Sequence, residues 1–257
     1  MVTLTSDIDR WLRRFPRGSE TGPRLVCFPH AGGASTFFHP LAAALADVAE
    51  VCAVQYPGRQ DRLAEAPHTS IDPLADEIAA VLGPLTDRPL ALFGHSMGSI
   101  VAFEVTRRLE ATPGAPVPSI VFPSGRAAPS RSRPGTVHQG DDAAVLDSIA
   151  KLGGTDRRVL ADPELIDLIL PATRADYQAI ETYRCAPGAT VAAELRVTIG
   201  DSDTAVTEAE AAAWAEHTTG GFDLAVLPGG HFYLSTQIEA VAERVRTGLL
   251  GAGIPLA

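Results

Sequence analysis

Short apolar runs alternate along the chain with longer segments in which apolar residues recur every three or four positions. The runs have the length of buried strands, and the longer segments have the spacing of helices that bury one face. This alternation predicts an α/β fold with a mostly parallel sheet covered by helices on both faces. The predicted strands are residues 24–28, 50–54, 90–93, 118–122, 195–199 and 222–227.

The alternation stops at Pro123. Residues 124–134 form an Arg-, Ser- and Pro-rich loop, and helical patterns follow at 143–152, 162–170 and 171–183. We therefore expect residues 1–123 and 188–257 to form the core, and residues 124–187 to form an insertion over the carboxyl edge of the sheet. Residues 1–23 are expected to be an arm, in which Trp11, Leu12 and Phe15 pack on the body.

Composition narrows the class of protein. The 257 residues carry a net charge of −10, which argues against a nucleic-acid surface. No apolar run is long enough to cross a bilayer, and the N-terminal segment lacks the apolar region of a secretory signal. Three widely spaced cysteines favour buried free thiols over a disulfide or zinc framework. We expect a cytoplasmic protein that is a monomer and contains no metal or cofactor.

The segment Gly94-His95-Ser96-Met97-Gly98 lies between a predicted strand and a predicted helix. This is the G-x-S-x-G pattern of a nucleophile elbow, a sharp turn that exposes a serine at the top of a sheet. Side chains at the two glycine positions would collide with the neighbouring strand or helix. Ser96 is the predicted nucleophile.

A serine nucleophile needs a base, and the base needs an acid that orients it. His231 follows the last predicted strand and a pair of glycines, which is the position of the base in the chain order Ser…Asp…His. Asp201 and Asp203 both lie in the loop after the preceding strand. Asp203 is the preferred acid, and Asp201 is then expected to bind local backbone N–H groups.

An acyl-transfer site also needs backbone donors for the oxyanion. Met97 supplies one at the start of its helix, and the turn 30–33 (HAGG) nominates the Ala31 N–H as the second. The turn lacks G-x-G-x-x-G, which argues against a dinucleotide site. His30 and His95 neighbour these donors without occupying the position of the base, so both are expected to be structural.

Taken together, these segments resemble the type II thioesterases of polyketide and nonribosomal peptide biosynthesis. The resemblance covers nearly the whole chain and includes motifs narrower than G-x-S-x-G. It rests on residues 28–33 (FPHAGG), 56–59 (YPGR), 94–98 (GHSMG), 124–129 (SGRAAP), 170–171 (LP), 174–176 (RAD), 181–183 (ETY) and 230–232 (GHF).

The resemblance implies an α/β-hydrolase core, a Ser96–Asp203–His231 triad and a helical lid over an acyl channel. It also implies hydrolysis of acyl groups from the phosphopantetheine arm of acyl or peptidyl carrier proteins, which clears stalled or aberrant intermediates. Carrier proteins are typically acidic, and Arg126, Arg131 and Arg133 cluster at the start of the predicted lid. These arginines either dock the carrier or simply keep a loop solvated.

Other functions fit the same pattern. One is release of a normal medium-chain fatty acyl product from a carrier protein, and another is an esterase for small free esters. A terminal cyclising thioesterase domain is disfavoured, because the chain begins and ends close to the core. A catalytically silent hydrolase-fold binding protein fits poorly, since no triad position is missing.

Overall fold

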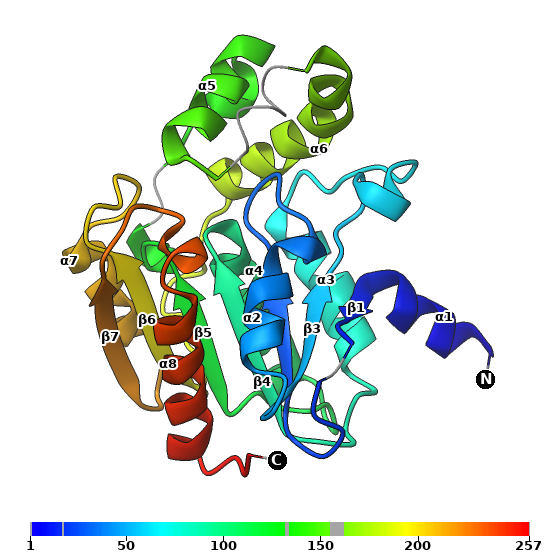
Figure 1. The fold of residues 1–257 in the computed structure, drawn as a ribbon, viewed down its shortest axis with the longest axis vertical. Helices are drawn as coiled ribbons and strands as arrows, with labels where there is room; N and C mark the ends of the chain where they lie inside the picture. The colour runs from blue at the N-terminus through cyan, green and yellow to red at the C-terminus, as the bar shows by residue number, and fades with distance from the viewer. Residues whose placement is uncertain (1, 17, 132–133, 155–161, 257) are drawn as a thin grey trace.

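A seven-stranded sheet forms the centre of the computed structural model, which describes residues 2–16, 18–131, 134–154 and 162–256 (Figure 1). All neighbouring strands are parallel except β1, which is antiparallel to β3. The alternation in the sequence thus predicted the sheet type correctly. In spatial order the strands are β1 (Leu12–Arg14), β3 (Glu50–Val54), β2 (Arg24–Phe28), β4 (Leu90–His95), β5 (Ile120–Ser124), β6 (Glu194–Gly200) and β7 (Phe222–Leu227).

Helices cover both faces of the sheet, with α2 and α8 in contact on one face and α3 and α4 in contact on the other (Figure 1). Helices α5 and α6 lie beyond the sheet's carboxyl edge. The α-helices are α1 (Val2–Trp11), α2 (His39–Ala44), α3 (Ile71–Leu82), α4 (Met97–Ala111), α5 (Asp142–Leu152), α6 (Pro163–Thr182), α7 (Glu208–Ala212) and α8 (Ile238–Gly251). The 3₁₀ helices are η1 (Ser35–Phe38), η2 (Gln60–Arg62), η3 (Pro129–Arg131), η4 (Val137–Gln139), η5 (Ala213–His217) and η6 (Tyr233–Ser235).

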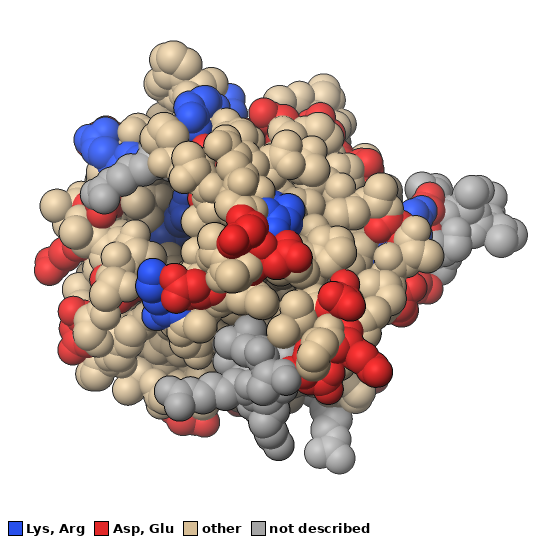
Figure 2. All heavy atoms as spheres, turned by 90° about the horizontal axis from the view of Figure 1, so that it is seen from above, with Lys and Arg blue, Asp and Glu red and all other residues tan. Residues whose placement is uncertain are grey.

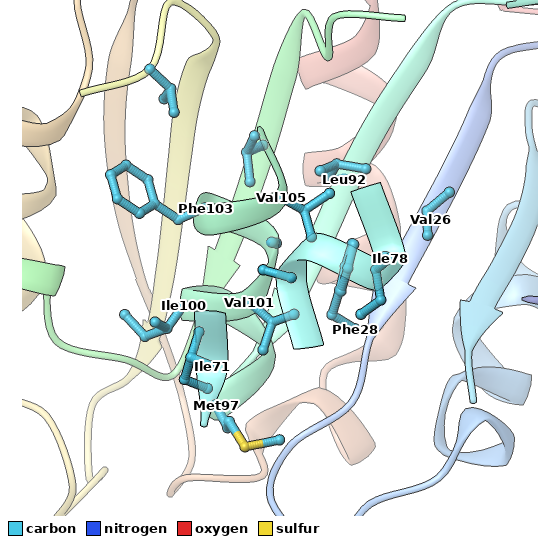
Figure 3. Close-up of a cluster of buried hydrophobic side chains, with 14 of the residues drawn as sticks. Val26, Phe28, Ile71, Ile78, Leu92, Met97, Ile100, Val101, Phe103 and Val105 are labelled. Carbon is cyan, nitrogen blue, oxygen red and sulfur yellow. The ribbon is translucent and has the colours of Figure 1, made fainter. Parts of the chain in front are cut away.

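Strand β2 shows why the central strands contain runs of consecutive apolar residues. Its residues alternate between the two faces, so Leu25 and Cys27 join the cluster beneath α2 and α8. Val26 and Phe28 join the cluster beneath α3 and α4, where Figure 3 shows them beside side chains of both helices. A strand buried on both faces therefore appears as a continuous apolar run.

Two predictions need correction. The N-terminal arm contains a helix, α1, and an edge strand, β1, in which Leu12 pairs with Val54. The two helices expected at 162–170 and 171–183 form one helix, α6, that continues through Pro171. Proline removes one backbone donor and tends to break helices, but packing of a helix on its neighbours overrides that tendency here.

The cysteines are free, as predicted: Cys27 and Cys52 are buried and Cys185 is half-buried. Burial raises the pKa of the Cys52 thiol to about 12, so this group stays protonated at neutral pH. Within the described residues, no helix is long and apolar enough to cross a membrane.

Candidate active site

The turn between β4 and α4 holds Ser96 in an unusual backbone conformation, with φ 54° and ψ −118°. Its N–H donates to the Ser124 carbonyl at 2.7 Å, which fixes the turn against β5. The flanking glycines are needed for close approach, since a Cβ on Gly94 would lie 2.2 Å from the Gly98 carbonyl oxygen. A Cβ on Gly98 would lie 2.0 Å from the Phe28 carbonyl oxygen. The sequence predicted this geometry.

Three side chains from separate loops meet at the carboxyl edge of the sheet. Ser96 follows β4, Asp203 follows β6 and His231 follows β7. The Ser96 Oγ lies 2.9 Å from His231 Nε2, and His231 Nδ1 lies 2.9 Å from Asp203 Oδ2. The side chains of His231 and Asp203 are both buried. This is the geometry in which an imidazole can take a proton from a serine hydroxyl.

The two candidate acids occupy different positions. Asp203 uses Oδ1 to accept the Ala205 N–H at 2.8 Å, which leaves Oδ2 facing the imidazole. Asp201 instead accepts the Gly229 N–H at 3.0 Å, so it ties together the loops after β6 and β7. The structure therefore places Asp203 against His231 and gives Asp201 the local backbone contact expected of the other acid.

The two nominated oxyanion donors flank the serine. Met97 is the first residue of α4, where backbone N–H groups have no partner within the helix. Ala31 lies in the loop after β2. Both residues line the same pocket as Ser96 and His231. An oxyanion formed at a carbonyl attached to Ser96 would therefore lie between two segments that carry N–H donors.

His30 and His95 lie near the His231 imidazole as neutral rings. Burial and the charges of His231 and Arg59 lower the pKa of His30 to about 3, and burial lowers the pKa of His95 well below its usual value. The His95 ring lies 5.2 Å from that of His231, and its Nδ1 lies 2.9 Å from Ser124 Oγ. Neither contacts Ser96 by hydrogen bond, which fits the structural role predicted for both.

A cavity of about 260 Å³ opens over the serine. Its floor comes from the core, and much of its wall comes from α5 and α6. Apolar and aromatic side chains dominate that wall, as in most small-molecule sites. They are Ile149, Leu152, Ile169, Tyr177, Ile180 and Phe232. Among the described residues, no group of three or more His, Cys, Asp or Glu could hold a metal ion.

The two described arginines at the start of the insertion, Arg126 and Arg131, have different surroundings. Arg126 lines the cavity, and its Nε is buried without a hydrogen-bond partner in the described part of the chain. Burial lowers the pKa of Arg126 to about 10, so its guanidinium remains charged at neutral pH. Arg131 is exposed and pairs with Glu216 at 2.5 Å. Arg133 lies outside the described residues.

No role for Arg59 and Asp176 was predicted from the sequence, although both lie in motifs that carry the family resemblance. The structure brings them together from positions 117 residues apart, next to the candidate oxyanion donor loop. No local pattern could reveal this pairing, because it depends on how α6 packs over the sheet.

Comparison with known proteins identifies the family. Residues 23–249 match the family model described as Thioesterase domain. The structure of the type II thioesterase BorB from the borrelidin biosynthetic cluster superposes with a TM-score of 0.87 at 46% identity, covering 94% of this chain and 98% of that one. The chain belongs to the type II thioesterase family.

Two further relatives of this thioesterase come from Streptomyces. It is 45% identical to a probable cadicidin biosynthesis thioesterase of Streptomyces griseus, over 97% of this chain and 68% of that protein. It is 43% identical to Thioesterase PikA5 of Streptomyces venezuelae, over 96% of this chain and 88% of that protein. Membership confirms the predicted α/β-hydrolase fold and the predicted enzyme class, a serine hydrolase that acts on thioesters.

Proposed function

We propose that this thioesterase uses Ser96, His231 and Asp203 to hydrolyse acyl groups held as thioesters on the phosphopantetheine arm of a carrier protein. The observation that carries the proposal is the chain of two 2.9 Å contacts, from Ser96 Oγ through the imidazole to Asp203, at the floor of a largely apolar cavity. The named relatives from borrelidin and cadicidin biosynthesis support a substrate on an antibiotic assembly line.

The reaction follows from the positions of these atoms. His231 Nε2 takes the Ser96 proton while Oγ bonds to the thioester carbonyl carbon, and the oxyanion accepts hydrogen bonds from the Ala31 and Met97 N–H groups. When the C–S bond breaks, His231 returns the proton to the sulfur, and the carrier leaves with a free thiol. Water then attacks the acyl-serine by the same route, which releases a carboxylic acid and restores Ser96. Asp203 orients the imidazole throughout.

Residues 124–187 act in this proposal as a lid. Within the described part of this segment, α5 and α6 supply cavity-lining residues that include Ile149, Ile169 and Ile180. The acyl chain would lie against these apolar side chains, while the pantetheine arm reaches Ser96 from outside. Exclusion of water by such a cover strengthens hydrogen bonds to the oxyanion and limits side reactions.

Arg126 and Arg131 serve different purposes in this proposal. Arg131 is exposed and lies beside η5, where it pairs with Glu216, and it remains a candidate for carrier docking, together with Arg133. Figure 2, which views the molecule from above, shows basic and acidic side chains of the described residues interspersed. Arg126 instead contacts polar oxygens of the bound arm or acyl group, because its guanidinium lines the cavity.

The test is mass spectrometry of a panel of acyl-loaded carrier proteins incubated with the wild type and with Ser96→Ala. The proposal predicts loss of the acyl mass from the carrier with the wild type alone. Faster turnover of a simple free ester than of any carrier-bound thioester would indicate a small-ester esterase. Selective release of one medium-length fatty acyl group would indicate product release, and equal activity in Ser96→Ala would contradict the triad.

The free cysteines and the origin of the three triad side chains bear on the cellular location and the assembly state of the enzyme. Carrier proteins of assembly lines are reached in the cytoplasm, and free buried cysteines suit that reducing compartment. We propose a cytoplasmic enzyme that works as a monomer, since all three triad side chains come from one chain.

A further inference from the structure

A buried ion pair joins α6 to the core directly beside the loop that carries Ala31. The Arg59 guanidinium, which follows β3, donates to both carboxylate oxygens of Asp176 on α6, at 2.6 and 2.9 Å. The two side chains are only 9% and 4% exposed. Such a bidentate pair is geometrically demanding, so it fixes how α6 sits on the loop after β3.

The same two residues also hold the backbone of the oxyanion loop, by which we mean residues 30–33. Asp176 Oδ2 accepts the Gly32 N–H at 2.8 Å, and Arg59 Nη1 donates to the Gly33 carbonyl at 3.0 Å. A Cβ on Gly32 would lie 2.8 Å from Thr173 Oγ1 of α6, which shows how closely the helix approaches. The peptide group before Gly32 and the peptide group after Gly33 are therefore tied to the ion pair.

Ala31 immediately precedes this clamped segment. The other end of the loop is held at Pro29, whose carbonyl accepts from the Tyr56 hydroxyl at 3.2 Å. Because the peptide N–H of Ala31 lies between two fixed points, its direction depends on Gly32 keeping its position. An oxyanion donor loses most of its effect when its N–H is misdirected, since hydrogen bonds weaken steeply with angle.

We infer that Arg59 and Asp176 are positioning residues for the oxyanion hole, and that docking of α6 is what completes it. This inference rests on the proposed function, in which the Ala31 N–H binds the oxyanion. If α6 moved away, Asp176 would leave with it. Arg59 would then keep its contacts with backbone carbonyls but lose its counter-charge, and the Gly32 N–H would lose its acceptor. Closure of the helix over a substrate and formation of a competent oxyanion hole are thus one event.

A pair of double variants separates this role from a merely structural one. Replacing both members of a buried ion pair with uncharged residues leaves no unpaired charge and often preserves stability. Arg59→Met/Asp176→Leu removes the acceptor of the Gly32 N–H, whereas Arg59→Met/Asp176→Asn keeps an amide oxygen at that position. The two variants therefore differ mainly in the hydrogen bond to the oxyanion loop.

The measurements are melting temperature, kcat and KM for an acyl-loaded carrier protein, and the rate at which a fluorophosphonate labels Ser96. That reagent forms a tetrahedral adduct whose oxygen occupies the oxyanion hole. We expect both variants to be folded, and the Leu variant to lose kcat and labelling rate together, by roughly 10²-fold, with little change in KM. The Asn variant should retain a kcat well above that of the Leu variant.

Equal kcat in two folded double variants and the wild type would overturn the inference. A higher KM with an unchanged kcat would also overturn it, because that result would indicate the loss of binding that is equal in the ground state and the transition state. Should one variant fail to fold, Asp176→Asn alone, assayed below its own melting temperature, gives the same comparison of kcat with labelling rate. Ser96→Ala is included as a reference, since activity in that variant would contradict the proposed function and not the role of Arg59 and Asp176.

Discussion

The backbone of Ser96 has a positive φ of 54°, a value that residues other than glycine rarely adopt. Such conformations cost on the order of 1–3 kcal/mol each and persist where the surrounding structure fixes them. Here β4, α4 and the hydrogen bond to Ser124 do so. The strain is a property of the backbone. Ser96→Ala therefore removes the hydroxyl group and leaves the contacts that hold the turn in this conformation.

The choice of acid gives a direct prediction at the residue scale. Asp203→Asn should lower turnover by roughly 10³–10⁴-fold, because an amide can donate to Nδ1 and hold the imidazole in the wrong tautomer. Asp201→Asn should have only a mild effect, since this carboxylate contacts a backbone N–H and not the imidazole. Steady-state kinetics on an acyl-loaded carrier protein check both, with circular dichroism to confirm folding. The reverse pattern would assign the acid to Asp201.

The buried imidazole of His30 predicts a pH dependence of stability. Its pKa falls from 6.5 to about 3 on folding, so the unfolded chain binds more protons between these values. The free energy of unfolding should therefore decrease as the pH falls below about 6.5, with this group contributing about 2 kcal/mol of loss by pH 5. His30→Gln should reduce the difference between urea unfolding at pH 7 and at pH 5 by about that amount.

The exposed His39 provides the matched control for this measurement. His39→Gln should leave the pH dependence of the wild type unchanged. An unchanged pH dependence in His30→Gln would mean that His30 is protonated in the folded protein, contrary to its environment.

Arg126 should show opposite effects on stability and activity. Its guanidinium has no hydrogen-bond partner at Nε among the described residues, and the nearby Glu181 accepts from the N–H groups of Val137 and His138 at 3.0 and 3.1 Å. Arg126→Met should raise the melting temperature by about 2–4 °C, since it removes a buried cation whose Nε lacks a hydrogen-bond partner among the described residues. Turnover of carrier-bound substrate should fall. Scanning calorimetry and kinetics test this, with exposed Arg131→Met as control, and full activity in Arg126→Met would contradict contact with substrate.

At the scale of elements, α6 is a helix with an internal weak point. Pro171 is exposed and provides no N–H for the preceding turn. Pro171→Ala restores that donor and should stabilise the helix by about 1–3 kcal/mol, offset in part by greater freedom of the unfolded chain. Hydrogen exchange over residues 163–182 should slow. Pro187→Ala, in the exposed loop before β6, should leave it unaltered. Unchanged or faster exchange in Pro171→Ala would show that Pro171 does not limit the helix.

Elements differ in how well their sequences predict them. The inner strands β2 and β3 have the predicted bounds, because burial on both faces imposes an apolar run that turns interrupt. The edge strand β7 also has its predicted bounds, although none of its residues is fully buried. Strand β1 has only three residues and exists because it pairs with β3, so nothing local distinguishes it from a loop. The sequence predicts two helices that meet at Pro171, whereas the structure has the single helix α6. The difference arises because local propensity contains no information about packing against Arg59 and Gly32.

At the scale of the whole molecule, topology explains why the site could be predicted as far as it was. Parallel strands place the loops after β2, β4, β6 and β7 at one edge of the sheet. Knowing which strand a candidate residue follows was therefore enough to predict that it lies at this edge. Ser96, His231, Asp203, Ala31 and Met97 all lie there. The pairing of Arg59 with Asp176 and the inward position of Arg126 depend on how the insertion packs. Chain order does not contain that information.

The measurement that tests the central proposal most directly is a rapid-quench experiment with an acyl-loaded carrier protein, followed by peptide mapping of the enzyme. We predict that the peptide containing Ser96 transiently gains the mass of the acyl group while the carrier thiol is freed, and that Ser96→Ala shows neither change. Release of the acyl group by Ser96→Ala at the wild-type rate, or an acyl adduct on another residue, would contradict it.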